Sequence, residues 1–340
     1  MRLGGLLTLL VIATLVAPVT ASAGTICLGR TATIVGTENA DVLMGTTGPD
    51  VIAGLGGNDD IQGLDGKDVI CSGEGNDTVT AGPGDDYVLA SGGDDQLDGG
   101  VGRNFIWFLG APGPIDARLT TGIADGWGYD TLTNFAGIIG SNFGDHLVGR
   151  PLAAAQDAAL EQIEGRGGDD EIVGTGARDF LIGGGGNDKI AAAGGNDDIL
   201  GSAGRDTLEA GAGHDYLVGG SGNDVQKGGT GYDYAFYDDS PGGVHVNLER
   251  GVASGFGSDR LSLVEGVVGS RHADVLRGNG RSNGLYGLAG ADKLYGLGSS
   301  DGLYGGAGPD RLEGGSGNDL GNGGAGRDSC LSIERPTSCP

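Results

Sequence analysis

An aspartate recurs at every ninth residue between Asp41 and Asp95, and an aliphatic residue stands two places after each one. Glycine fills most of the space between them, as in the row from Gly54 to Gln62. The aspartates of this first set are Asp41, Asp50, Asp59, Asp68, Asp77, Asp86 and Asp95. A fixed period of carboxylates, glycines and single apolar residues predicts stacked coils of equal length that share cations.

Two further sets of rows follow the same period, and a large part of the chain is duplicated. Residues 36–149 match residues 165–278 at a constant offset of 129, so Asp145 aligns with Asp274. The aspartates of these later rows are Asp145, Asp170, Asp179, Asp188, Asp197, Asp206, Asp215, Asp224, Asp233, Asp274, Asp292, Asp301, Asp310, Asp319 and Asp328. The sequence therefore predicts two copies of one module and a shorter terminal array.

Each row is expected to form one turn and one short strand. Glycines in the first half allow the positive φ angles of a tight turn, and the aspartate ends that turn. The next three residues form a strand whose middle side chain, such as Ile52 or Ile70, points inward. Two rows make one coil of 18 residues, and successive coils stack as parallel strands. The predicted fold is an all-β parallel β-roll or β-helix solenoid.

Stacking places carboxylates of neighbouring coils close together, for example Asp50 with Asp68 and Asp59 with Asp77. Unpaired carboxylates at such range repel one another, and a cation between them reverses that repulsion. Ligand sets made only of carboxylate and turn-carbonyl oxygens suit Ca²⁺ better than a transition metal or Mg²⁺. We predict several bound calcium ions, with all the row aspartates as candidate ligands.

The rows resemble the hemolysin-type calcium-binding (RTX) repeat, whose consensus is G-G-x-G-x-D-x-U-x. Good matches are Gly183–Ala191, with Asp188, and Gly305–Glu313, with Asp310. The resemblance implies a parallel β-roll that holds Ca²⁺ between turns through these aspartates and glycine-turn carbonyls. Asn104 and Asn283 stand where the pattern has aspartate, so sites that involve them are expected to be weak or absent.

The N-terminal residues and the net charge bear on compartment and partners. Residues 1–23 read as a secretory signal peptide with Arg2, an apolar stretch from Leu6 to Val16 and a small-residue cleavage site, so the mature chain is expected to begin at Gly24. The formal net charge of −26 disfavours nucleic acid and anionic membranes as partners. No later segment is apolar enough to span a bilayer. The predicted location is extracellular.

Four cysteines in an exported chain favour disulfides, and they allow three pairings. We favour Cys27–Cys71 with Cys330–Cys339, because each bond would staple one end of the repeat array. No histidine accompanies the cysteines in a zinc-binding pattern.

The predicted organisation has one linker and two inserts. Residues 24–149 form the first module with an insert at 108–139, residues 165–268 the second module with an insert at 237–268, and residues 269–340 the terminal array and cap. The alanine-rich residues 150–164 are a linker or a short helix that covers a roll end. Within the second insert, Val244–Leu248 and Arg260–Val264 alternate like strands.

The sequence contains no convincing match to a known catalytic motif. None of the four histidines, His146, His214, His245 and His272, forms a metalloprotease motif, and Gly298–Gly302 matches a serine-hydrolase elbow only formally, inside a repeat row. We predict no catalytic residues and no enzyme activity.

Tyrosines 286, 295 and 304 recur every nine residues and predict cross-strand packing or, alternatively, a contact surface for a cell-surface glycan or protein.

Two functions remain after these exclusions. The first is a secreted calcium-binding protein with a structural or adhesive role, whose β-roll folds around Ca²⁺. The second is a non-catalytic, calcium-dependent accessory module of a secreted hydrolase or polysaccharide-modifying system. Repeats and inserts occupy the chain from Cys27 onward and leave no separate globular catalytic segment, so the first function is preferred.

Overall fold

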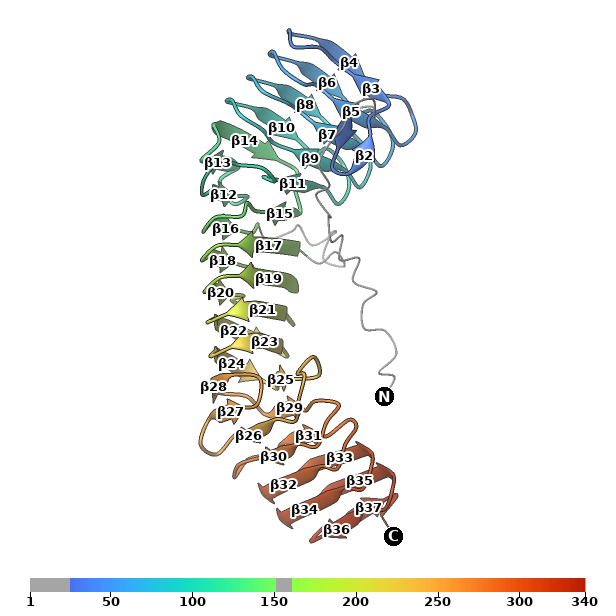
Figure 1. The fold of residues 1–340 in the computed structure, drawn as a ribbon, viewed down its shortest axis with the longest axis vertical. Helices are drawn as coiled ribbons and strands as arrows, with labels where there is room; N and C mark the ends of the chain where they lie inside the picture. The colour runs from blue at the N-terminus through green and yellow to red at the C-terminus, as the bar shows by residue number, and fades with distance from the viewer. Residues whose placement is uncertain (1–24, 151–160, 340) are drawn as a thin grey trace.

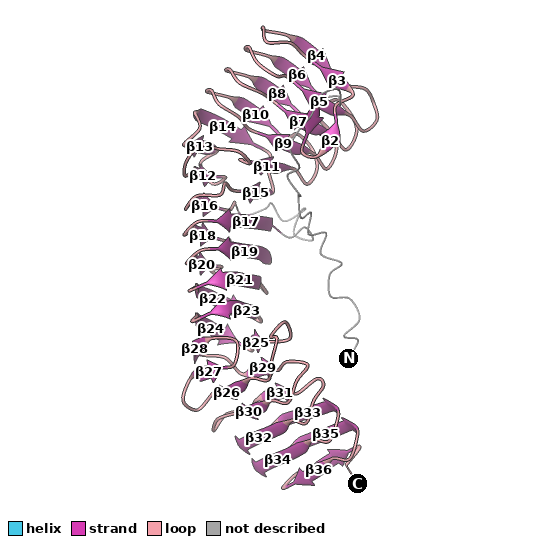
Figure 2. Ribbon diagram, viewed as in Figure 1, coloured by secondary structure: helices cyan, strands magenta, loops and turns pink. Residues whose placement is uncertain are grey.

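The computed structural model describes residues 25–150 and 161–339, and these residues form an elongated parallel β-solenoid (Figure 1). Figure 2 shows strands and loops, and no helix, in this part of the chain. The all-β solenoid predicted from the nine-residue period is confirmed. The predicted signal peptide, residues 1–23, lies outside the described residues.

Two long sheets run the length of the solenoid, and consecutive rows contribute strands to them alternately. The first sheet, which we call the concave sheet, has 16 strands: β3 (Ile34–Val35), β5 (Val51–Ala53), β7 (Val69–Cys71), β9 (Tyr87–Leu89), β11 (Phe105–Trp107), β15 (Gly137–Ile139), β17 (Glu161–Gly167), β19 (Asp179–Gly185), β21 (Asp198–Gly204), β23 (Tyr216–Gly222), β25 (Tyr234–Phe236), β29 (Gly266–Val268), β31 (Gly284–Tyr286), β33 (Gly302–Ala307), β35 (Leu320–Ala325) and β37 (Arg335–Thr337).

The second sheet, which we call the convex sheet, contains the remaining strands apart from a small hairpin. Its strands are β4 (Val42–Met44), β6 (Asp60–Gln62), β8 (Thr78–Thr80), β10 (Gln96–Asp98), β12 (Asp116–Arg118), β13 (Ile123–Asp125), β14 (Tyr129–Thr133), β16 (His146–Val148), β18 (Glu171–Val173), β20 (Lys189–Ala191), β22 (Thr207–Gly213), β24 (Val225–Gly231), β26 (His245–Asn247), β27 (Val252–Ser254), β28 (Ser258–Ser262), β30 (Val275–Arg277), β32 (Lys293–Gly298), β34 (Arg311–Ser316) and β36 (Ser329–Leu331).

The core is a ladder of the single apolar residues that follow each aspartate. Ile52 pairs with Ile70 in parallel register, and both side chains are completely buried. Glycine is required where the turns stack: Gly66 has a φ of +149°, and a Cβ there would lie 2.7 Å from the carbonyl oxygen of Gly48 in the preceding coil. The apolar ladder and the glycine turns together explain why the nine-residue row repeats so strictly.

Each insert widens only the convex sheet. In the first insert β14 pairs with β10, β12 pairs with β16, and β13 runs antiparallel between β14 and β12. The concave sheet meanwhile continues directly from β11 to β15. β26, β27 and β28 repeat this arrangement in the second insert. The predicted strands at Val244–Leu248 and Arg260–Val264 correspond to β26 and β28.

The inserts account for the bent shape of the molecule. Two additional strands add about 10 Å to the convex sheet at each insert. Figure 1 shows that the solenoid axis turns at both inserts and that the concave sheet lies on the inside of the arc. The bend is therefore a geometric consequence of the unequal number of strands in the two sheets.

Disulfides close both ends with the pairing favoured above. Cys27 lies in β1 (Ile26–Cys27), which forms an antiparallel hairpin with β2 (Arg30–Thr31), and bonds to Cys71 in β7 with a Cα–Cα distance of 5.8 Å. Cys330 in β36 bonds to Cys339 with a Cα–Cα distance of 5.9 Å. Each bond restricts the unfolded chain at an end where no further coil stacks on the described strands.

The predicted linker or helix at residues 150–164 is only partly within the described structure. Residues 151–160 lie outside it, and Glu161, Gln162 and Ile163 belong to strand β17. A helix that extended to Ile163 is therefore wrong: Gln162 and Ile163 pair with Gly137 and Ile138 and continue the concave sheet. A membrane-spanning helix is also absent from the described residues.

Candidate calcium sites

The structure places every row aspartate at the start of a strand, in two columns, one along each sheet. All of these side chains except Asp41 are buried. Hydrogen bonds join each column into a ladder, because the backbone N–H of one aspartate donates to Oδ1 of the aspartate one coil later. Examples are Asp50 to Asp68 at 2.9 Å and Asp59 to Asp77 at 2.8 Å. The residues predicted to be neighbours, Asp50 with Asp68 and Asp59 with Asp77, are thus joined by hydrogen bonds from backbone to side chain.

The second carboxylate oxygen is left without a donor in most rows. Oδ2 is buried and has no hydrogen-bond partner in sixteen of the row aspartates: Asp59, Asp68, Asp77, Asp86, Asp95, Asp170, Asp188, Asp197, Asp206, Asp215, Asp224, Asp233, Asp292, Asp301, Asp310 and Asp319. An unpaired buried carboxylate oxygen is unfavourable by itself. Sixteen repeats of the same orphaned atom indicate sites for a positively charged group.

These orphaned oxygens lie beside backbone carbonyls. At Gly201, the position that a Cβ would occupy is 2.5 Å from Oδ2 of Asp206 and 2.7 Å from the carbonyl oxygen of Gly219 in the next coil. We call such a space, bounded by Oδ2 and a backbone carbonyl, a cradle. Where glycine stands five residues before the aspartate this space is free, and its two acceptor oxygens suit a hard cation. A serine or alanine Cβ occupies the same position before Asp77, Asp86, Asp95, Asp197 and Asp215.

Five row aspartates are satisfied by their own turns. In these rows a threonine or serine four residues earlier donates both its backbone N–H and its hydroxyl to the carboxylate. The pairs are Thr37 with Asp41, Thr46 with Asp50, Ser141 with Asp145, Thr175 with Asp179 and Ser270 with Asp274. These carboxylates have less need of an ion than the other candidates.

Burial raises the pKa of most of the orphaned carboxyls. The pKa of Asp206 is raised from 3.8 to about 7, first by burial and then by the charges of Asp188 and Asp224, against a lowering hydrogen bond from Asp188. Burial likewise raises the pKa of Asp95 to about 7 and of Asp170 to about 8. The solenoid without ions therefore favours protons on these groups, and a cation would relieve the same strain.

Five acidic residues belong to the two columns but were not predicted as site residues. Asp130 and Asp259 accept the N–H groups of Asp95 and Asp224 across the inserts. Glu265 and Glu334 accept from Asp233 and Asp319, and Glu161 pairs with Asp179 in the concave sheet. The carboxyls at 130 and 259 could have been found, because they align at the offset of 129 and each precedes a leucine by two places.

No cluster of three or more histidine, cysteine, aspartate or glutamate side chains suited to a metal occurs in the described chain. A cation in a cradle would therefore depend on backbone carbonyls as well as carboxylates. Oxygen-only sets of this kind fit Ca²⁺, which accepts six to eight oxygens in flexible geometry. The residues that would hold it are the orphaned aspartates and the first residues of the stacked rows.

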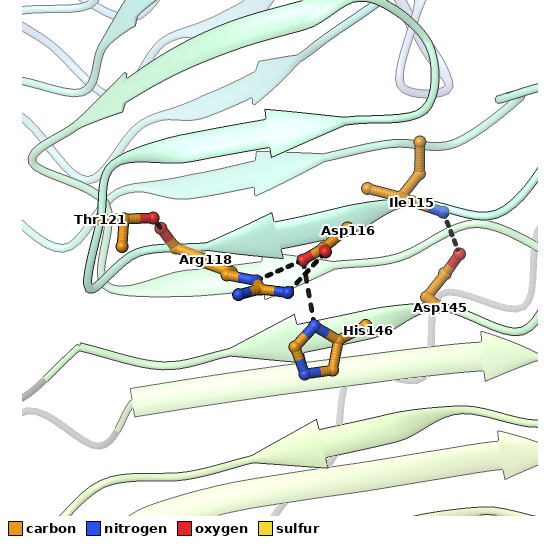
Figure 3. Close-up of polar contacts among 6 residues, drawn as sticks. All are labelled: Ile115, Asp116, Arg118, Thr121, Asp145 and His146. Atoms are coloured by element: carbon orange, nitrogen blue, oxygen red, sulfur yellow. Dashed lines mark hydrogen bonds and ion pairs between the residues drawn. The ribbon is translucent and has the colours of Figure 1, made fainter.

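The side chain of His146 lies outside the two aspartate columns. Figure 3 shows His146 on β16 with Nδ1 3.0 Å from Oδ1 of Asp116, which Arg118 also contacts at 2.7 Å. All three side chains are substantially exposed. Asp145 points away from this group and accepts the N–H of Ile115. The arrangement is a surface ion-pair group beside the ladder.

The tyrosine repeat divides between the two sheets. Tyr286 and Tyr304 stack with centroids 4.5 Å apart and planes 5° apart on the concave sheet, whereas Tyr295 lies in β32 of the convex sheet. The prediction of one contact surface made by all three tyrosines is therefore wrong, because rows nine residues apart alternate between the two sheets. The stacked pair supports the cross-strand packing interpretation.

The fold and its columns define the class as a parallel β-roll built from glycine-aspartate nonapeptides. A family model for the RTX calcium-binding nonapeptide repeat matches residues 35–70, 72–106, 164–199, 192–226, 200–235, 268–303 and 295–330, more than half of the chain. The chain belongs to the RTX calcium-binding repeat family. A comparison with curated proteins finds no significant match.

Replacing Asp206 by asparagine is expected to make the protein less dependent on calcium. The neutral amide removes the penalty for a buried charge, so stability in EGTA at pH 6.5 should rise by on the order of 1–2 kcal/mol. The gain in Tm on adding calcium should shrink, because one ligand is lost. Thermal unfolding followed by circular dichroism measures both. Asp60→Asn, at an exposed position of β6, is the control, and equal behaviour of the two variants would contradict the site.

Proposed function

We propose that this protein is a secreted calcium-binding repeat protein whose β-roll folds around Ca²⁺ held in the cradles, with a structural or adhesive extracellular role. The observation that carries the proposal is the set of sixteen buried, donor-free carboxylate oxygens along the two columns. Each needs a cation or a proton, and membership of a calcium-binding repeat family favours the cation. The ligands would be these aspartates and the carbonyls of the stacked turns.

Secretion is supported by the N-terminal sequence and by the disulfides. Residues 1–23 have the pattern of a signal peptide, and both disulfides suit an oxidising compartment. Calcium modules outside cells typically bind at roughly 10⁻⁴–10⁻³ M. A chain with this affinity would stay largely unloaded before export and fold after release.

A structural or adhesive role without catalysis is supported by how repeat rows and inserts fill the described part of the chain. The described residues are occupied by rows, inserts and a disulfide-closed hairpin. Calcium would then set the rigidity of an elongated surface whose bend comes from the inserts. A cell-surface glycan or protein is the class of partner that such a surface would meet.

Isothermal titration calorimetry of the mature chain with CaCl₂ tests the proposal. We expect saturable binding of several ions per chain with dissociation constants of roughly 10⁻⁴–10⁻³ M. Titration with MgCl₂ serves as the control, because Mg²⁺ demands tighter octahedral geometry and should release little heat. Absence of saturable calcium binding would contradict the proposed function.

A further inference from the structure

The carboxylate ladder is not continuous along the solenoid. In the convex sheet it runs from Asp41 to Asp130, starts again at Asp145, and ends at Asp259 before starting at Asp274. Between these stretches the antiparallel strands β13 and β27 contribute no carboxylate rung to the ladder. In the concave sheet Ala136 interrupts the column: its N–H donates to the carbonyl of Asn104.

Each stretch begins with rows that are complete without an ion. We call the stretches that begin at Asp41, Asp145 and Asp274 arrays 1, 2 and 3. The hydroxyl-capped carboxylates are Asp41 and Asp50 in array 1, Asp145 and Asp179 in array 2, and Asp274 in array 3. Array 3 also begins in the concave sheet with Asn283, whose amide donates to the carbonyl of Glu265 at 3.0 Å.

The ends of arrays 1 and 2 also carry side-chain donors where the inner rows have none. Asn104 Nδ2 donates to the carbonyl of Asn134 at 3.2 Å. The hydroxyl of Tyr237 donates to Oδ2 of Asp259 at 3.1 Å, so that carboxylate is not orphaned.

We propose that these donors replace the cation at both inserts, so that the inserts are calcium-independent joints and the three arrays load calcium separately. Within an array, one ion fixes a turn that supplies ligands to the next ion, because each carboxylate is hydrogen-bonded to the aspartate one coil away. In the convex sheet, the first carboxylate after each joint accepts from a residue that carries no carboxylate: Ile115 donates to Asp145 and Val244 donates to Asp274. In the concave sheet the N–H of Asp233 still donates to Glu265, and the ladder ends there, because Asn283 donates to the carbonyl of Glu265. This inference rests on the proposed calcium function and concerns how the sites are grouped.

Hydrogen exchange with mass spectrometry during a calcium titration of the full mature chain tests the grouping. Peptides from each array report the calcium concentration at which that array becomes protected. The variants are Asp68→Asn in array 1, Asp206→Asn in array 2 and Asp310→Asn in array 3, with the exposed Asp60→Asn as control. Each ladder variant should shift the midpoint of its own array by about threefold or more. The midpoints of the other two arrays should stay unchanged.

A variant that shifts all three arrays together would overturn the inference while leaving calcium binding intact. Absence of calcium-dependent protection in every array would instead remove the proposed function and the inference with it. A second set of variants checks the joints directly: Asn104→Asp and Tyr237→Phe replace donors with the family aspartate and with the residue found at the matching position 108. If the joints act as proposed, the combined variant should raise the calcium requirement of the rows beside the inserts.

Discussion

Removal of calcium is expected to abolish most of the strand signal of the mature chain at pH 8. Without ions, sixteen buried carboxylate oxygens have no donor, and neighbouring carboxylates repel along both columns. At 10 mM calcium and a dissociation constant of about 1 mM, each site contributes about 1.4 kcal/mol to folding. Four such sites already contribute about 6 kcal/mol, comparable with the total stability of a typical domain. The loss should therefore be cooperative and large.

Far-ultraviolet circular dichroism in EGTA, followed by addition of excess CaCl₂, measures this effect. The strand signal should return on addition of calcium. Magnesium at the same ionic strength is the control, because general screening of a chain with net charge −26 would respond to either cation. The same strand signal and Tm in EGTA and in calcium would refute calcium-coupled folding.

Mild acid is expected to restore the fold of the metal-free chain. Burial raises the pKa of Glu161 and Asp170 to about 8, and of Asp197 and Asp292 to about 7, from ordinary values near 4. The folded state therefore binds more protons than the unfolded state across this range, and the free energy of unfolding falls as pH rises from about 4 to 8. Protons at pH 5.5 occupy most of these carboxyls and remove the need for cations.

Thermal unfolding in EGTA at pH 5.5 and at pH 8 measures this difference. The Tm should be higher at pH 5.5, and the strand signal should exceed that at pH 8. In excess calcium the trend should reverse, because protons compete with ions for the same oxygens. Equal Tm values in EGTA at both pH values would show that the orphaned carboxyls do not limit the metal-free fold.

Much of this structure follows from local rules that the row contains in full. The glycine turn, the inward aliphatic residue and the aspartate are all set within nine residues, so the period predicts coils, ladder and core. Inward Ile52 and Ile70 pair as expected, and the cysteines bond as favoured because stacking brings the chosen partners together at the ends. The offset of 129 likewise predicts that the second insert repeats the first.

Other features depend on which coil faces which. Tyr295 is separated from Tyr286 and Tyr304 because alternate rows enter opposite sheets. The predicted coil of two rows already implies this separation, whereas the nine-residue period of the tyrosines alone does not show it. Glu161 takes a column position through its pairing with Asp179, although a linker or helix was predicted there. Thr46 and Asp50 form a self-contained turn whose effect on the carboxylate appears only with atomic geometry.

The sequence by itself determined the repeat, the candidate ligands and the family resemblance, because each is encoded inside one row or by comparison of rows. The tertiary structure decided which candidate carboxylates lack a donor, which are satisfied by a neighbouring hydroxyl or amide, and where the ladder breaks. Those outcomes depend on contacts between coils 18 or 35 residues apart. Whether an aspartate at every ninth residue needs an ion is therefore a property of the stacked coils rather than of the row alone.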